Sequence, residues 1–433
     1  MRLLFVHQNF PGQYRHIAAH YARQGHQVVA LGEKPNLLRN KPNIPGAGLL
    51  GYEMRKLDAV GFEAPVLRAI RRGQQVAAAA SRLRRAGLRP DVIFAHIGWG
   101  EALFLKDVFP EARVILYCEF FYGARGSDLG FDPEFPPTPD KLLRTRVTNA
   151  PLLMALDACD VGMAPTHWQQ RQFPAAQRGR IVTIHDGIDT DVVRPLTGPA
   201  GEPEKELITY VARNLEPYRG FHTFMRAIPE IQRRRPNARI VIVGGDEVSY
   251  SPRVPEGQTY RERLTKELEG KIDFSRVQFT GRIPYADYVR LLQRSSVHVY
   301  LTYPFVLSWS MLEAMSAGCL VVGSRTPPVE EVIRDGENGL LTDFFSAQAI
   351  AEKIDQALSM DQRPLRERAR ATVVERYDLK RVCLPAQLRL VESLKRQRAD
   401  ARPAADVQHL PRDKAGVPVG EEEHRARDVV DVT

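Results

Sequence analysis

The chain has 433 residues, of which 43% are hydrophobic and 26% are charged. This composition excludes wholesale disorder and collagen-like repeats, and at roughly 100–200 residues per domain the length predicts two or three domains. All apolar runs fall short of the roughly 18 residues needed to cross a bilayer. The apolar stretch at the amino terminus is too short for a signal peptide, so we expect a cytoplasmic protein.

The four cysteines are scattered and form no Cys-x-x-Cys pair, which argues against a zinc site and against a disulfide framework. Lys and Arg number 61 against 52 Asp and Glu, a formal net charge of +9. This balance suits an anionic partner, such as a phosphate ligand, a membrane surface or nucleic acid.

The first 195 residues alternate short apolar runs with amphipathic stretches. Residues 3–6 and 27–31 are typical of buried parallel strands, and the helical periodicity of residues 13–23 ends at Gly25. These three segments predict one β-α-β unit. The same alternation predicts a helix at 75–85 and strands at 92–95, 113–117 and 161–164.

The chain then changes character twice. Residues 196–206 are rich in Pro, Gly and charge, which predicts a linker between a domain at 1–195 and one at 207–375. A helix is expected over 376–396, where it could return to the first domain, and the polar segment 397–433 is expected to be disordered. In the second domain, strands are predicted at 207–212, 239–243, 277–280, 297–300 and 320–323, and helices at 221–235, 259–268, 285–294, 310–316 and 347–358.

This pattern predicts an α/β protein with two Rossmann-like, doubly wound domains facing a central cleft. Open parallel sheets bind ligands outside the carboxyl ends of their strands. Gly12 opens the helix after the first strand, where free N–H groups and a partial positive charge suit a phosphate, although plain β-α turns are common. Arg213 and Arg219 flank a turn at the equivalent edge of the second domain, either as phosphate ligands or as solvated surface residues. Glu313 follows in an apolar helix, where it could accept hydrogen bonds from a ribose diol. Alternatively, the carboxylate is there only because the helix dipole stabilises a negative charge near the start of a helix.

These segments, in this order, resemble the family-4 glycosyltransferases, which have the GT-B fold. Residues 182–189 and, especially closely, 318–341 carry the same resemblance, which covers roughly residues 1–390. The opening His-Gln-Asn-Phe-Pro-Gly-Gln-Tyr-Arg-His resembles a bacterial subgroup. The resemblance implies retaining transfer of a sugar from a UDP- or GDP-sugar to a glycan, lipid-linked or protein acceptor, in polysaccharide, glycolipid or protein glycosylation. It implies no cofactor besides the donor and no metal.

The resemblance also assigns roles to residues of this sequence. Arg213 matches an arginine of the family's diphosphate clamp, and Arg219 replaces its lysine. Glu313 matches a glutamate that binds the donor ribose, and His96 matches a catalytic histidine beside the transferred sugar. The implied donor-binding residues are Gly12, Arg213, Arg219, Gly281, Arg282, Ile283, Ser308, Trp309 and Glu313.

One position departs from the family. The family has a first glutamate seven residues before the position of Glu313, and Phe305 stands there. A phenyl ring cannot act as a carboxylate, so the contact to the donor sugar is missing or supplied elsewhere. Glu119 is either a substitute for it or an ordinary carboxylate at the end of a strand. The phenylalanine at this position favours an alternative function, a protein that binds a nucleotide sugar without transferring it. A sugar-nucleotide epimerase of related fold is a further alternative.

Other motifs are set aside or left with two interpretations. The string Gly-Ala-Gly-Leu-Leu-Gly at 46–51 imitates a dinucleotide fingerprint but follows no predicted strand. Asp189 and Asp191 imitate a metal-binding Asp-x-Asp, in a turn where a structural role is favoured. The arginines at 68–89 form either a solvated helix face or a surface for an anionic membrane. Aromatic residues do not interleave with them, so nucleic acid is not expected.

Overall fold

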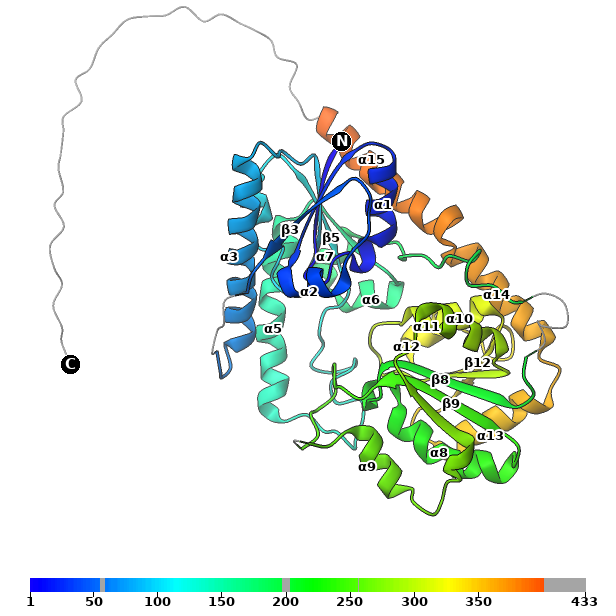
Figure 1. Ribbon diagram of the computed structural model, residues 1–433. Helices are drawn as coiled ribbons and strands as arrows, with labels where there is room; N and C mark the ends of the chain where they lie inside the picture. Colours follow the sequence, from blue (N-terminus) through cyan, green and yellow to red (C-terminus); the bar gives the residue numbers. More distant parts are fainter. Residues whose placement is uncertain (55–58, 197–202, 256, 401–433) are drawn as a thin grey trace, which may run out of the picture. The chain divides into compact units, whose positions relative to one another are not determined.

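The computed structural model describes residues 1–54, 59–196, 203–255 and 257–400. The expected tail beyond residue 400 and the centre of the expected linker lie outside the described residues. Residues 1–391 pack as one unit, which contains both sheets (Figure 1). All the cavities considered below also belong to this unit.

In the described part of the chain, the first half forms a seven-stranded parallel sheet in the order β3-β2-β1-β4-β5-β6-β7. The order reverses between β1 and β4, as in doubly wound folds. The strands are β1 (Arg2–Val6), β2 (Gln27–Glu33), β3 (Ala47–Tyr52), β4 (Val92–His96), β5 (Arg113–Tyr117), β6 (Val161–Ala164) and β7 (Ile181–Thr183). The helices are α1 (Arg15–Arg23), α2 (Lys34–Asn40), α3 (Ala64–Arg85), α4 (Leu105–Val108), α5 (Pro139–Ala158), α6 (His167–Gln172) and α7 (Ala175–Arg178).

The described residues from 207 onward form a six-stranded parallel sheet in the order β10-β9-β8-β11-β12-β13. Its strands are β8 (Leu207–Asn214), β9 (Arg239–Gly245), β10 (Val277–Gly281), β11 (Val297–Tyr300), β12 (Leu320–Ser324) and β13 (Leu340–Thr342). Its helices are α8 (Phe221–Arg234), α9 (Tyr260–Glu267), α10 (Tyr285–Arg294), α11 (Trp309–Ala317), α12 (Pro327–Glu330), α13 (Ala347–Ser359) and α14 (Arg363–Tyr377). The fold is therefore the expected α/β arrangement of two doubly wound domains.

Continuous apolar strands explain why helices cover both faces of each sheet. In β1, Leu3 to Val6 are all fully buried, and β12 is buried along its whole length. Parallel sheets with both faces covered need such strands, whereas one-sided sheets alternate apolar and polar residues. Helix α8 shows the complementary helix pattern, because Phe224, Ala227, Ile228 and Ile231 recur every three or four residues and are all buried.

A long connection between β5 and α5 joins the two domains. We call residues 120–137 the bridging loop. Its Phe120 is part of the core of the second domain. The Tyr218 hydroxyl donates to Asp128 (2.9 Å), the Tyr303 hydroxyl donates to Asp132 (2.7 Å), and Arg226 pairs with Glu134 (2.6 Å). The bridging loop therefore holds the first domain against the second through two buried hydrogen bonds and one partly exposed ion pair.

The chain after α14 continues into a π-helix (Leu379–Cys383) and α15 (Leu384–Asp400). Asp378 forms a parallel bridge with Ile188 and accepts a hydrogen bond from Thr190. Gln387 also donates to the carbonyl of His185 (3.2 Å). The segment after α14 thus contacts the last loop of the first domain. Among the described residues, no helix is both long enough and apolar enough to span a membrane.

Candidate functional site

Two adjoining cavities lie where the carboxyl ends of both sheets meet. The larger has a volume of about 570 Å³ and the smaller about 160 Å³. The first domain contributes the turn around Gly12 and the segment that begins at Asp186, and the second contributes the ends of β8 and β9 and the start of α11. This is the position expected for a ligand site in two facing doubly wound domains.

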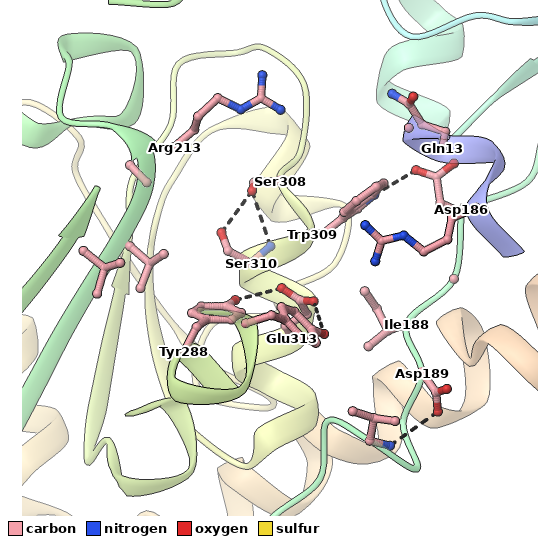
Figure 2. Close-up of a pocket in the computed structure, with 18 of the residues that line it drawn as sticks. Gln13, Asp186, Ile188, Asp189, Arg213, Tyr288, Ser308, Trp309, Ser310 and Glu313 are labelled. Atoms are coloured by element: carbon pink, nitrogen blue, oxygen red, sulfur yellow. Dashed lines mark hydrogen bonds between the residues drawn. The ribbon is translucent and has the colours of Figure 1, made fainter. Parts of the chain in front are cut away.

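A contact between the domains borders both cavities. The Trp309 indole N–H donates to Oδ2 of Asp186 (2.8 Å), and the Tyr117 hydroxyl donates to the same oxygen (2.9 Å). Figure 2 shows the Trp309 ring reaching across to Asp186. Burial raises the pKa of Asp186 to about 7, although both hydrogen bonds act to lower it. Its Oδ1 has no hydrogen-bond partner among the described residues.

Glu313 presents a carboxylate to the larger cavity. It is the fifth residue of α11, beyond the first turn, so the helix dipole does not account for its position. The hydroxyls of Tyr285 and Tyr288 each donate to one of its oxygens at 2.8 Å (Figure 2). Burial raises the pKa of Glu313, and the two tyrosine hydrogen bonds oppose that shift. A carboxylate fixed in this way still has lone pairs for the hydroxyls of a ligand.

The two arginines of the expected clamp have different environments. Arg213 lines both cavities, is exposed, and makes no hydrogen bond or ion pair with any described residue. Arg219 lines only the smaller cavity. Its Nη1 donates to the Tyr300 hydroxyl (3.2 Å), to Oγ1 of Thr302 (2.9 Å) and to the Val306 carbonyl (2.9 Å). Arg213 is thus free to bind an anion, whereas Arg219 also supports the fold.

Gly12 is required by the shape of the turn that it forms. Its φ is +47°, and a Cβ there would lie 2.8 Å from the His7 ring. A larger residue would meet both the backbone penalty and this clash. The turn Gly12–Tyr14 then leads directly into α1 at the wall of the larger cavity.

His96 lies below the cavities and lines neither of them. It is 1% exposed, stacks on Trp99 with ring centroids 3.9 Å apart, and accepts a hydrogen bond from the Gly98 N–H at Nδ1 (2.9 Å). His7 and His185 close their turns with the same bond to the residue two positions on. Burial lowers the pKa of His7 to about 3 and that of His185 to about 4. These two histidines are therefore neutral turn-forming residues.

Glu119 stands between His96 and the smaller cavity. It lines that cavity together with Arg213 and Arg219. Burial acts to raise the pKa of Glu119, but His96 and the two arginines outweigh it and lower the pKa below its usual value. The carboxylate is therefore ionised at neutral pH.

The expected donor residues gather at these cavities, with one exception. Seven of them line the larger cavity: Gly12, Arg213, Arg282, Ile283, Ser308, Trp309 and Glu313. Arg219 lines the smaller one, and Gly281 ends β10 at φ +66° without lining either. Ser308 caps α11 by accepting from the Ser310 N–H (3.3 Å). The Arg282 guanidinium donates to Asn214 (2.9 Å) and Glu247 (2.5 Å).

Sequence reasoning gave no donor-binding role to several residues of the larger cavity. Arg15 and His16 line it directly after Gly12, and Asp186 lines both cavities. The turn at Gly12 was the available signal for the first two. Asp186 sits in the segment 182–189 that carries the family resemblance, but its partner Trp309 is 123 positions away.

The motifs set aside have other roles. The string at 46–51 falls largely within β3, an edge strand. Asp189 and Asp191 both bind the Lys380 ammonium, at 3.1 and 2.8 Å. No cluster of three or more His, Cys, Asp or Glu residues suited to a metal occurs among the residues that the structure describes.

Comparisons with known proteins agree with the architecture. A family model described as Glycosyl transferase family 4 group matches residues 24–193, and one described as Glycosyl transferases group 1 matches residues 197–373. A D-inositol 3-phosphate glycosyltransferase of Corynebacterium aurimucosum is 26% identical over 200 residues, which is 43% of this chain and 45% of that protein. The chain spans about half the length of the curated relatives it matches.

Solved structures match over nearly the whole chain. Sucrose-phosphate synthase of Thermosynechococcus elongatus has a TM-score of 0.67 at 18% identity, covering 93% of this chain and all of that one. Anabaena HepE in complex with UDP and glucose has a TM-score of 0.63 at 18% identity, covering 92% and 100%. At these identities the likeness shows the fold. Because the two family models together match most of the chain, the chain belongs to the family-4 glycosyltransferases, and the solved structures show that it has their GT-B fold.

Proposed function

We propose that this protein transfers a sugar from a UDP- or GDP-sugar to an acceptor held by its first domain. The observation that carries the proposal is the larger cavity. It brings together Arg213, whose guanidinium has no partner among the described residues, and the Glu313 carboxylate, which two tyrosines hold in place (Figure 2). A nucleoside diphosphate carries complementary groups, a diphosphate and a ribose diol. The UDP bound in the similar Anabaena structure supports the choice of ligand class.

The site residues divide the donor among them. Glu313 would accept hydrogen bonds from the ribose diol, and the backbone around Arg282 and Ile283 would hold the base. Arg213 and the N–H groups at the turn of Gly12 would bind the diphosphate, with Arg219 behind them. Positive charge from the protein would then stabilise the leaving group, so we propose a reaction without a metal. The pairing of Asp189 and Asp191 with Lys380 is consistent with this.

The proposed reaction retains the configuration of the sugar. The bond from C1 of the sugar to the β-phosphate oxygen breaks, and its electron pair stays on the diphosphate. The acceptor oxygen forms the new bond to C1 on the same face, and its proton passes to a diphosphate oxygen. The protein orients the two substrates and stabilises the departing charge. His96 lines neither of the two donor-side cavities, so its expected role would require a rearrangement on donor binding.

A third cavity offers room for an acceptor. It has a volume of about 570 Å³ and is lined from the first domain by Tyr122, Lys141, Arg144 and Thr148. Tyr250 lines both this cavity and the smaller donor-side cavity. An acceptor surface in the first domain favours a transferase over an epimerase, which needs none.

Membrane contact belongs to the same proposal. Arg82, Arg84, Arg85 and Arg89 are exposed at the end of α3 and just beyond it, although Arg84 and Arg89 also donate to backbone carbonyls. Sedimentation with vesicles of phosphatidylglycerol and phosphatidylcholine tests this surface. Binding that is lost in the double variant R82E/R85E supports docking, and equal binding of both proteins contradicts it.

A thermal-shift screen tests donor binding. UDP-glucose, UDP-N-acetylglucosamine and GDP-mannose are added at increasing concentration, with glucose 1-phosphate as the control. A ligand at 100 times its dissociation constant adds about 2.7 kcal/mol to stability, so a true donor raises Tm and glucose 1-phosphate does not. The absence of a shift with every nucleotide sugar and with UDP and GDP would contradict the proposal.

Phe305 favours one second candidate function, a protein that binds the donor without cleaving it. An assay of donor hydrolysis separates the two functions, because only a transferase would cleave the donor.

A further inference from the structure

The smaller cavity is shaped as an extension of the larger one. Eight residues line both cavities, among them Gln13, Asp186, Arg213, Ser308 and Trp309. With a volume of about 160 Å³, the smaller cavity is much smaller than the 570 Å³ cavity that it adjoins. It lies just beyond Arg213, the arginine proposed to hold the diphosphate. A group attached to the far end of that diphosphate would therefore lie in it.

The Glu119 carboxylate lines this cavity and makes only long contacts with its neighbours. The Gln13 amide donates to its Oε1 at 3.4 Å, and His96 Nε2 lies 3.5 Å from its Oε2. Both distances exceed the 2.7–3.2 Å of ordinary N–H···O hydrogen bonds. The neighbouring His96, Arg213 and Arg219 keep the pKa of Glu119 low despite its burial. It is thus a charged group that only accepts hydrogen bonds and has lone pairs to spare.

The backbone of Glu119 is fixed from both domains. The Gln169 amide donates to the Glu119 carbonyl (2.6 Å). The next residue, Phe120, packs edge-on against Phe305 with ring centroids 4.7 Å apart, and both rings are 3% exposed. Phe305 also packs on Tyr250 (4.9 Å), another residue of the smaller cavity. Phe305 stands where the family has its first glutamate, and in this protein its ring anchors the segment that carries Glu119.

We infer that the smaller cavity is the subsite for the transferred sugar, and that Glu119 accepts hydrogen bonds from the hydroxyls of its ring. This inference rests on the proposed function. The carboxylate for the sugar then comes from the first domain, at the end of β5, while the diphosphate is held from the second. A sugar ring supplies several O–H donors at close spacing, which is the chemistry that an ionised, under-bonded carboxylate recognises. The ligand class is a hydroxyl-bearing sugar ring attached to a nucleoside diphosphate.

The test compares Glu119→Gln with a control, Glu111→Gln. Both variants remove one negative charge, but Glu119 lies two residues after β5 and Glu111 lies two residues before it. Glu111 is exposed and has no hydrogen bond or ion pair among the described residues. Affinities for UDP, UDP-glucose, UDP-N-acetylglucosamine, GDP and GDP-mannose are measured by calorimetry on the full chain. Melting temperatures confirm that both variants are folded, and Glu119→Asp is the conservative variant.

We expect Glu119→Gln to weaken binding of the preferred nucleotide sugar by about tenfold, the scale of one hydrogen bond to a charged group. Binding of the matching UDP or GDP should stay equal or tighten, because the lost negative charge lies beside the arginines. Glu119→Asp should recover part of the loss, and Glu111→Gln should match the wild type. Equal effects of Glu119→Gln on nucleotide sugar and bare nucleotide, or no effect on either, would overturn the inference. Failure of the wild type to bind any of the five ligands would instead contradict the proposed function.

Discussion

The two arginines near the diphosphate position should respond differently to truncation, because only one of them is used by the fold. Arg213 has no bond to lose within the described residues, so R213A should leave the melting temperature unchanged. Loss of one charged hydrogen bond to the diphosphate costs about 1.5–3 kcal/mol, or roughly 10- to 150-fold in UDP or GDP affinity. In R219A the Tyr300 hydroxyl, Oγ1 of Thr302 and the Val306 carbonyl each lose a donor. Leaving such buried groups unpaired costs about 1–3 kcal/mol of stability in addition to any loss of affinity.

The assay is calorimetric titration with UDP and GDP, combined with thermal denaturation of each variant. Arg290 is a matched control, because it lies on α10 in the same domain with a side chain 72% exposed, where it only pairs with Asp287 at 3.7 Å. R290A should match the wild type in both measurements. If the wild type binds UDP or GDP and R213A binds it with the same affinity, the reasoning is refuted. An R219A variant as stable as the wild type would refute the structural role of Arg219.

Three further predictions follow from the site. EDTA should leave sugar transfer or donor hydrolysis intact, because the charge on the leaving group is met by arginine; an absolute need for a divalent cation would make Asp189 and Asp191 candidate ligands. D186N should gain stability over the wild type as pH rises, because the raised pKa of about 7 makes the folded wild type lose stability between pH 4 and pH 7, at up to about 1.4 kcal/mol per pH unit; a Tm difference that is the same at pH 5 and pH 7 would contradict this. H96A should lower turnover at least about tenfold, some 1.4 kcal/mol of barrier, with little change in UDP affinity; preserved turnover per folded molecule, with a lower Tm, would assign His96 a structural role only.

The fold was largely predictable because its strands are short, apolar and separated by clear helices. Strands β5, β6 and β11 and helix α10 have the bounds that the pattern predicts. The helix expected at 75–85 begins instead at Ala64. Several arginines interrupt the apolar pattern of its first half, and Gly73 disfavours a helix by its low helix propensity. Packing decides otherwise, since a Cβ at Gly73 would lie 2.8 Å from the Gly100 carbonyl.

The elements that were missed have weak local signals. The edge strand β3 contains Gly48 and Gly51, which are typical of turns. Strands β7 and β13 are three residues long, below the length at which a periodic pattern is visible. Helix α5 has almost no amphipathic pattern and contains Pro151, so nothing in its sequence favours one face. Each is held in place by packing and pairing with neighbouring elements, which a local pattern does not reveal.

The candidate site divides in the same way. Gly12, Arg213 and Glu313 could be predicted because each belongs to a local motif at the end of a strand or the start of a helix. The Trp309–Asp186 contact could not, because it joins the two domains. The surroundings of Glu119 could not be predicted either. In the sequence Phe305 only replaces a carboxylate, whereas in the structure its ring packs on Phe120, the residue after Glu119. Residue types at single positions do not reveal contacts that the packing of two domains creates.

Release of nucleoside diphosphate tests the central claim most directly. Wild type, R213A and R290A are incubated separately with UDP-glucose, UDP-N-acetylglucosamine and GDP-mannose, and freed UDP or GDP is quantified over time. The account predicts that the wild type and R290A hydrolyse at least one donor at the same rate, and that R213A is at least about tenfold slower at subsaturating donor. A wild type that binds a nucleotide sugar but never releases its nucleotide, with or without a sugar acceptor, would contradict the claim that this protein is a transferase.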